Sequence, residues 1–412
     1  MPNHVVRFQL SNAGSTEAQG INVSQALWNA RIEKGENDFL TGAQVIVGEA
    51  VVPMGSTVVG SICHDYSGNL YLTDSVQHAV YKIREDNTLT LIAGLPGTAG
   101  DLVDVSIKDP ATGRTRAAFR NPNGICCDRS GNIYVCDTGN NKIKVISKET
   151  IRLLAGGSSG FVDADDGKSA KFVMPRDITM DKSGVFYVCD TGNHAVRKVW
   201  GNGKTLTIAG NGTPGNAMNV RASKYTATFN EPVGIAVDAK GDLFVLDTIA
   251  NKVIKKITPE GWVYRFSGSG ATGKSLGSHD PANGYTYSDN CSYQNIQGCD
   301  VDESGNLYLI DMGWPVGGAW GRLLRLDQNG RPFVVADFNA LTYDVFAYDV
   351  VCTPGQKLYV VFSDEEYVEM SSSSNSSSSE SSPSSQSSSS SSSSSEGFSA
   401  SSSSSSESSP GL

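Results

Sequence analysis

The sequence predicts an all-β fold, a six-bladed β-propeller whose blades each contain four antiparallel strands. Three observations lead to this prediction: a motif that recurs six times, apolar runs short enough to be strands, and turn residues between those runs. The clearest copy spans 124–146 and reads GICCDRSGNIYVCDTGNNKIKVI. Units that contain four short strands and repeat along a chain are typical of propeller blades, which stand radially about one axis.

Five further copies align with this one, at 61–83, 177–199, 234–257, 298–326 and 349–362. Each copy has one aromatic residue inside its second predicted strand. These residues are Tyr71, Tyr134, Tyr187, Phe244, Tyr308 and Tyr359, with spacings of 63, 53, 57, 64 and 51 residues. The unit is therefore constant, whereas the connections between units vary in length.

The strands follow in order within each copy. An apolar first strand (125–128) leads into Ser-Gly-Asn, where glycine supplies a positive φ and the preceding aspartate caps the turn. The second strand (133–137) is almost entirely apolar, as expected for a strand covered on both faces. The third (142–146) alternates polar and apolar residues, which predicts that one of its faces meets water. A fourth strand follows at 151–156.

The aspartate at the end of each second strand could belong to a carboxylate cluster. Because it recurs in nearly every copy, we expect a structural role instead, in which it accepts hydrogen bonds from the Thr-Gly-Asn amides that follow. The five residues are Asp74, Asp137, Asp190, Asp247 and Asp311.

A link of the form Ala-x-Phe-x-x-Pro precedes the first strand at 117–122, 170–175 and 227–232. Together with the repeated unit, this link resembles NHL repeats over roughly residues 58–363. The resemblance implies a propeller and leaves function open, because one fold serves many functions. Propeller lyases and lactonases of this type hold Ca or Zn in the central channel with residues at the starts of the inner strands. The matching positions here hold Asn123, Arg176, Glu231 and Gln297, which include no histidine.

The sixth copy predicts only two strands, ending near Phe362. Residues 3–8, NHVVRF, resemble the third strand NHAVRK at 193–198, and 45–48, VIVG, resemble a fourth strand. A propeller that stops short leaves an open sheet edge. We therefore expect residues 1–50 to close the last blade, residues 51–370 to form the propeller, and residues 371–412 to form a separate tail.

The tail at 371–412 contains 30 serines among its 42 residues. Such a segment has too little apolar surface to offset the entropy lost on folding, so we expect it to be disordered. Its serine runs are similar in composition to those of marine microbial and viral surface proteins. This similarity favours a virion or cell-surface setting.

Charge and hydropathy exclude some classes of partner. The net charge of −10 does not favour nucleic acid, and we expect the basic residues of the third strands to form a charged outer surface. These residues include Arg197, Lys198, Lys255 and Lys256. No run of about 18 apolar residues predicts a membrane span. The N-terminal residues lack the pattern of a signal peptide, so we expect cytoplasmic synthesis.

The eight cysteines lie mostly within predicted strands and lack metal-site spacing. We expect buried thiols, with a disulfide between Cys291 and Cys299 as the alternative. No catalytic triad can be proposed from spacing, and no metal ligand set is predicted.

Four insertions (95–121, 211–230, 268–296 and 312–321) map to one face of the predicted propeller. Extra chain on one face of a repeat protein usually builds its binding surface. Trp314 and Trp320 lie in the Gly-rich insertion. They suit contact with protein or glycan, or fold back over the blade.

The expected function is a non-catalytic interaction module for protein or carbohydrate with no cofactor. The alternative is a channel lyase or lactonase with bound Ca or Zn. Ligand, host and oligomeric state are not indicated by the sequence.

Overall fold

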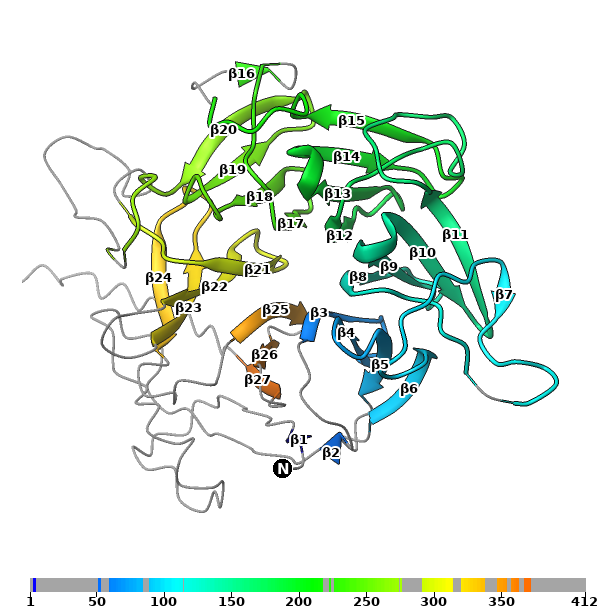
Figure 1. The fold of residues 1–412 in the computed structure, drawn as a ribbon. Helices are drawn as coiled ribbons and strands as arrows, with labels where there is room; N and C mark the ends of the chain where they lie inside the picture. The colour runs from blue at the N-terminus through cyan, green and yellow to red at the C-terminus, as the bar shows by residue number, and fades with distance from the viewer. Residues whose placement is uncertain are drawn as a thin grey trace, which may run out of the picture. The chain divides into compact units, whose positions relative to one another are not determined.

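The computed structural model describes residues 3–4, 51–52, 59–83, 89–113, 115–217, 222–223, 226–273, 275, 291–313, 320–337, 347–353, 357–362 and 367–371. All of them lie in the first of two units, Met1–Ser374 and Asn375–Leu412. This part is an all-β propeller (Figure 1). The helical elements described are two 3₁₀ turns, η1 (Thr138–Asn140) and η2 (Thr191–Asn193). Across the same residues, no helix is long and apolar enough to cross a membrane.

Consecutive strands pair antiparallel within each blade, as the repeated turns require. The first three blades comprise β3 (Val59–His64), β4 (Leu70–Asp74), β5 (Ala79–Ile83) and β6 (Leu89–Gly94) in blade 1; β8 (Pro122–Cys127), β9 (Ile133–Asp137), β10 (Lys142–Ser147) and β11 (Thr150–Gly156) in blade 2; and β12 (Pro175–Met180), β13 (Phe186–Asp190), β14 (Ala195–Val199) and β15 (Thr205–Ala209) in blade 3.

The next two blades have the same order of strands. They comprise β17 (Gly234–Val237), β18 (Leu243–Asp247), β19 (Val253–Ile257) and β20 (Trp262–Ser267) in blade 4, and β21 (Ile296–Val301), β22 (Leu307–Gly313), β23 (Trp320–Leu326) and β24 (Pro332–Asp337) in blade 5. Two of the long insertions add an outer fifth strand instead of forming only surface loops. These strands are β7 (Val105–Ser106) on β11 and β16 (Ala222–Ser223) on β20.

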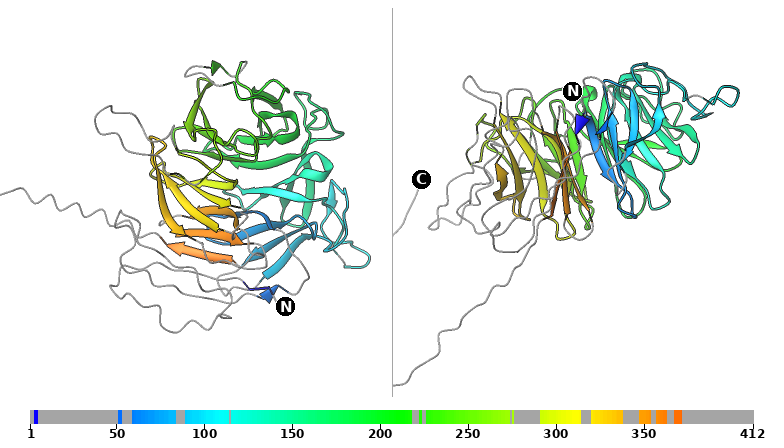
Figure 2. Two further views of the ribbon diagram at one scale, coloured as in Figure 1. Left: turned by 60° about the vertical axis from the view of Figure 1, so that its left-hand side comes forward. Right: turned by 90° about the horizontal axis from the view of Figure 1, so that it is seen from below.

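The described residues form five complete blades, not the six that the repeats predict. The sixth copy forms a three-stranded sheet of β25 (Ala347–Thr353), β26 (Lys357–Phe362) and β27 (Tyr367–Ser371). Its first strand packs between β21 and β3, so the first strands follow one another around the axis (Figure 1). In the views of Figure 2 the sheets stand beside one another as separate layers.

The prediction that the N-terminal segment supplies the third strand of the last blade is wrong. The position beside β26 is taken by β27, from the chain that follows β26 directly. The N-terminal strand β1 (Asn3–His4) pairs instead with β2 (Val51–Val52). A strand that continues its own sheet needs only a short loop, which costs less entropy than bringing in a distant segment. Residues 45–48, and the tail beyond Ser371, lie outside the described residues.

The hydrophobic core lies between neighbouring blades, because each blade is apolar on both faces. The phenylalanines of the Ala-x-Phe links are fully buried in three successive core clusters. They are Phe119, Phe172 and Phe229. The link that the sequence singles out therefore fills the space between one blade and the next.

Inner strands approach so closely that some positions accept only glycine. A Cβ added to Gly298 would lie 2.0 Å from Asp349 Oδ1 and 2.6 Å from its Cα. We expect Gly298→Ala to lower the free energy of unfolding by about 1–3 kcal/mol, because the strands must separate to admit it. Gly201→Ala is the matched control, since nothing lies within 4 Å of its added Cβ. Equal denaturation midpoints for the two variants would contradict this packing.

Candidate functional site

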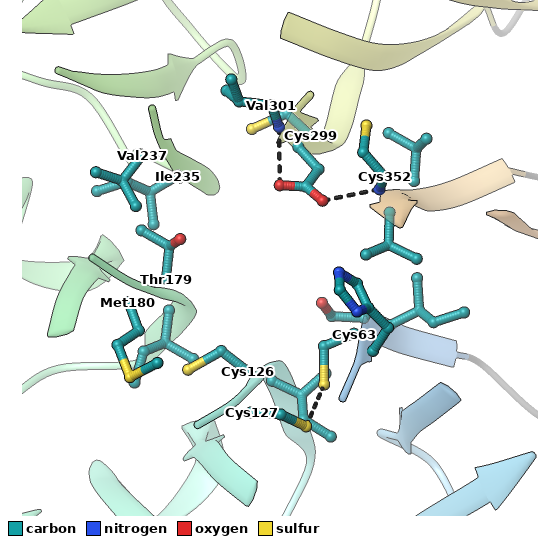
Figure 3. A pocket seen from close by; sticks show the side chains of 18 of the residues that line it. Cys63, Cys126, Cys127, Thr179, Met180, Ile235, Val237, Cys299, Val301 and Cys352 are labelled. Atoms are coloured by element: carbon teal, nitrogen blue, oxygen red, sulfur yellow. Dashed lines mark hydrogen bonds between the residues drawn. The ribbon is translucent and has the colours of Figure 1, made fainter. Parts of the chain in front are cut away.

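A cavity of about 530 Å³ lies on the propeller axis. It is lined by the first strands of the five blades and by β25, and it extends to the turns that follow these strands. Figure 3 shows side chains from all around the ring converging on it, among them Cys63, Thr179 and Cys352. Seven of the lining residues are acidic: Asp177, Asp181, Asp238, Asp300, Asp302, Glu303 and Asp349. Lys182 and His64 are the basic residues of the lining.

Three of these carboxylates join neighbouring sheets. Asp177 accepts hydrogen bonds from the backbone N–H of Ile178 in its own strand and of Ile235 in blade 4, both at 2.8 Å. Asp300 likewise accepts from Cys352 in the next sheet, at 2.8 Å. The inner edge of a first strand has no partner strand, so its N–H groups need other acceptors. These carboxylates supply them.

Asp349 makes the corresponding connection between the three-stranded sheet and blade 1. Its Oδ2 accepts from the Ile62 N–H at 3.0 Å and from the Ser61 hydroxyl at 2.6 Å. Burial raises the pKa of Asp349 well above its usual value, and the charge of Asp177 adds to this. Burial also raises the pKa of Asp177 to about 7, against the hydrogen bonds from Ile235 and Ile178. Asp177 is therefore a channel carboxyl group that can hold or release a proton near neutral pH.

A second set of carboxylates stabilises each blade away from the axis. Asp190 accepts from the Val173 N–H and from the Asn193 side chain, and Arg197 lies 2.6 Å from it. Corresponding buried ion pairs are Asp137–Lys144, Asp247–Lys255 and Asp311–Arg322. The structural role predicted for these aspartates is confirmed, but the partners differ from the expected Thr-Gly-Asn amides. They are the preceding link, the asparagine side chain and a cation of the third strand.

The prediction that third-strand cations face solvent is wrong for two of them. Arg197 and Lys255 are fully buried, because both faces of a third strand pack against neighbouring blades. Each lies over the phenylalanine of an Ala-x-Phe link: Arg197 is 4.8 Å from the Phe172 ring, and Lys255 is 4.7 Å from the Phe229 ring. These cations thus hold link, second strand and third strand together.

Blade 1 departs from this pattern. Tyr81 takes the third-strand position that Lys144 holds in blade 2, since Tyr81 pairs with Leu72 as Lys144 pairs with Val135. Asp74 instead accepts from the Val76 and Gln77 N–H groups, which are the following amides that the sequence predicts. Burial raises the pKa of Asp74 to about 6, against these hydrogen bonds. Blade 1 therefore carries a buried carboxyl group that titrates close to neutral pH.

The residues predicted for the channel lie at or just before the beginning of the first strand of a blade. The cavity is lined instead by residues further along these first strands. Asn123 and Arg176 are half-buried in β8 and β12. Glu231 is exposed in the link before β17, and its N–H donates to His194 Nδ1 at 3.0 Å. Gln297 lies in β21, and its side chain is not described.

The structure does not describe the side chains of the two tryptophans proposed for binding. Trp314 lies outside the described residues. Trp320 is the first residue of β23 and pairs with Gly313 through its backbone, and its side chain is not described. The structure thus places Trp320 in a strand, not in the insertion where the sequence analysis placed it.

Apolar side chains are exposed on the loops at the start of the inner strands. We call this the loop face: it carries the connections from fourth to first strands and from second to third strands. Six of the nine large hydrophobic side chains exposed among the described residues lie there, in the connections of blades 1 to 3. They are Val76, Leu95, Leu102, Phe161, Val162 and Met174. Hydrogen bonds such as Met174 N–H to Asn141 Oδ1, at 2.9 Å, fix these connections to one another.

All eight cysteines lie among the described residues and none of them forms a disulfide, so the alternative disulfide between Cys291 and Cys299 is wrong. Cys291 contacts the Ser267 hydroxyl at 3.1 Å, and Cys299 lines the cavity. Sequence reasoning missed the channel carboxylates, although a signal for two of them exists. Asp177 and Asp349 occupy the position at which other copies have glycine or serine.

The family model described as "NHL repeat" matches residues 119–146 and 172–199. NHL repeat-containing protein 2 of Bos taurus is 30% identical over 160 residues, 35% of this chain and 22% of that protein. The chain thus spans about a fifth of the length of the curated relatives it matches first. A probable peptidyl-alpha-hydroxyglycine alpha-amidating lyase of Caenorhabditis elegans is 27% identical over 148 residues, 35% of this chain and 38% of that protein. A solved gluconolactonase of Xanthomonas campestris shares 16% identity over 75% of this chain and 84% of its own, with a TM-score of 0.48.

Proposed function

Because this chain belongs to the family of NHL-repeat proteins, we propose that it is a non-catalytic interaction module that binds a protein partner through its loop face. The observation that carries the proposal is the group of six exposed apolar side chains on that face. Exposed apolar groups that gather on one face favour association, because binding removes them from water. Most of them are aliphatic, which suits a protein surface better than a sugar ring.

The rigidity of the loop face supports the same function. Asn121 donates its N–H to His78 Nδ1 at 3.1 Å and its side-chain amide to the Ser75 carbonyl at 3.0 Å. The Asn140 side chain donates to the Gly100 carbonyl at 2.7 Å. Connections fixed in this way lose little conformational entropy on binding, so more of the interaction energy becomes affinity.

The test compares two serine variants of the purified full chain. We expect Met174→Ser to weaken binding of the partner about tenfold, because the removed side chain is 56% exposed, the most exposed of the six. Leu206→Ser is the matched control: Leu206 is 40% exposed, but it lies on the outer strand β15. Partners captured by cross-linking are identified by mass spectrometry and their affinities measured. Equal binding by the two variants would count against the loop face.

A second function, a lyase or lactonase at the axial cavity, is favoured by one observation. Asp177 has its pKa raised to about 7 by burial, and such a group can act as a general base at neutral pH. The similarity to a probable amidating lyase adds to this. The described residues do not fit a Ca or Zn ion, because no three His, Cys, Asp or Glu side chains among them converge on one point. Stoichiometric Ca or Zn in the purified protein would nevertheless favour this alternative over the interaction module.

A carbohydrate ligand, and a virion or cell-surface setting, stay predictions of the sequence. A glycan array probed with the wild-type chain tests the first of them. Binding of a glycan that Met174→Ser leaves unchanged would place the carbohydrate site away from the loop face.

A further inference from the structure

Cysteines are concentrated around the axial cavity. Five of the eight in the chain line it, and they come from four sheets. They are Cys63, Cys126, Cys127, Cys299 and Cys352. Figure 3 shows these side chains around one opening. A cavity open to small molecules and lined by thiols can react with small electrophiles and oxidants.

Two of these thiols face one another across the seam between blades 1 and 2. The Sγ atoms of Cys63 and Cys127 are 3.1 Å apart, and the dashed line in Figure 3 joins them. Cys63 belongs to β3 and Cys127 to β8, which pack together without a shared backbone ladder. A disulfide bond is about 2.0 Å long, so the sulfur atoms need to approach by about 1 Å.

The two thiols differ in accessibility. Cys63 is 7% exposed, whereas Cys127 is half-buried at the edge of the cavity. Burial raises the pKa of the Cys63 thiol well above its usual value, and the contact with Cys127 raises it further. Since the thiolate is the attacking species, Cys127 reacts first and Cys63 second.

We propose that Cys63 and Cys127 form a redox pair that small disulfides of the glutathione type oxidise to a reversible disulfide between blades 1 and 2. The Cys127 thiolate attacks one sulfur of the small disulfide, which forms a mixed disulfide and releases one thiolate. The Cys63 thiolate then attacks Cys127 Sγ and releases the second. The protein loses two electrons and two protons, and the small disulfide becomes two thiols.

The bond would join directly two inner strands that share no backbone ladder. It closes a loop of 64 residues, which restricts the unfolded chain. We expect oxidation to raise the melting temperature by about 5 °C, and dithiothreitol to reverse the rise. We also expect the second step to speed up with increasing pH, because it needs the thiolate of Cys63.

The test equilibrates the full chain with mixtures of oxidised and reduced glutathione, blocks free thiols with N-ethylmaleimide and maps disulfides by mass spectrometry. Trypsin releases Cys126 and Cys127 in one peptide, 121–129, so the Cys126→Ser variant is used to leave a single thiol there. We expect a cross-link between this peptide and the one that contains Cys63. Cys127→Ser should lose both the cross-link and the rise in melting temperature. Cys189→Ser, at a fully buried position away from the cavity, should keep both.

Two results would overturn the proposal. One is that Cys127 forms only the mixed disulfide with glutathione, and no disulfide with Cys63, at every ratio of oxidised to reduced glutathione. The other is a cross-link that Cys126→Ser abolishes, since this would assign the pair to Cys126. Where a serine variant fails to fold, fragment ions that separate Cys126 from Cys127 locate the cross-link in the wild-type chain.

Discussion

Replacing Arg197 by leucine is expected to lower the free energy of unfolding by about 3–5 kcal/mol. The Arg197 side chain is fully buried, with Nη1 2.6 Å from Asp190 Oδ2 and Nη2 2.7 Å from Asp163 Oδ1. Removing the guanidinium leaves the buried carboxylate of Asp190 without its opposite charge. Burial already raises the pKa of Asp190, with Arg197 acting against it, so the variant should also lose more stability as pH rises.

Two variants decide whether the buried charge is the cause. Lys204→Leu removes an exposed pair with Asp165, in which the side chains are 47% and 88% exposed, and should cost less than about 1 kcal/mol. Adding Asp190→Asn to Arg197→Leu should recover part of the loss, because the uncompensated charge is then gone. Urea denaturation at pH 7 measures all three. If the unfolding free energy of Arg197→Leu alone lay within 1 kcal/mol of the wild-type value, Arg197 would contribute little to stability.

The repeated blade could be predicted from sequence because its signals are local. The Asp-x-Ser-Gly-Asn turn occurs as expected: Asp128 Oδ1 accepts from the Ser130 and Asn132 N–H groups, and Gly131 has a φ of 77°. The last sheet was predicted less well, because the likeness of residues 3–8 to a third strand says nothing about the strand with which they pair. Pairing depends on topology and loop length, and here β27 is nearer along the chain.

The candidate site was harder to predict, since its residues are defined by their neighbours in space. The alternating pattern of the third strands is the same whether one face meets water or another blade, so Arg197 gave no signal that it is buried. The contact between Cys63 and Cys127 likewise depends on how two inner strands pack. By contrast, Asp177 and Asp349 can be recognised by comparing the copies, because a carboxylate there departs from the small residue of the other units.

Asp177→Asn should gain stability relative to the wild type as pH rises. We expect the variant to change from less stable than the wild type to more stable between pH 4 and pH 8. Burial raises the pKa of Asp177 to about 7 in the folded state, from a reference of 3.8. Between these values the folded protein binds one more proton than the unfolded chain, so the stability of the wild type falls with rising pH. A difference of about three units corresponds to about 4 kcal/mol over the whole range. Asparagine cannot ionise and escapes this loss.

Asp181, four residues later on the same strand and turn, provides a control of opposite sign. Burial would raise its pKa, but hydrogen bonds from Ser183, Val185 and Tyr187 hold the pKa below the usual value. Its ionised form therefore stabilises the fold above pH 4, and this contribution disappears as pH falls through the lowered pKa. Asp181→Asn should thus lose stability relative to the wild type as pH rises towards 4, whereas Asp177→Asn gains as pH rises above 4. Denaturation midpoints measure the two slopes, from pH 2 to 4 for Asp181→Asn and from pH 4 to 8 for Asp177→Asn. If the slopes had the same sign, the channel carboxylate would not carry the proton that its burial implies.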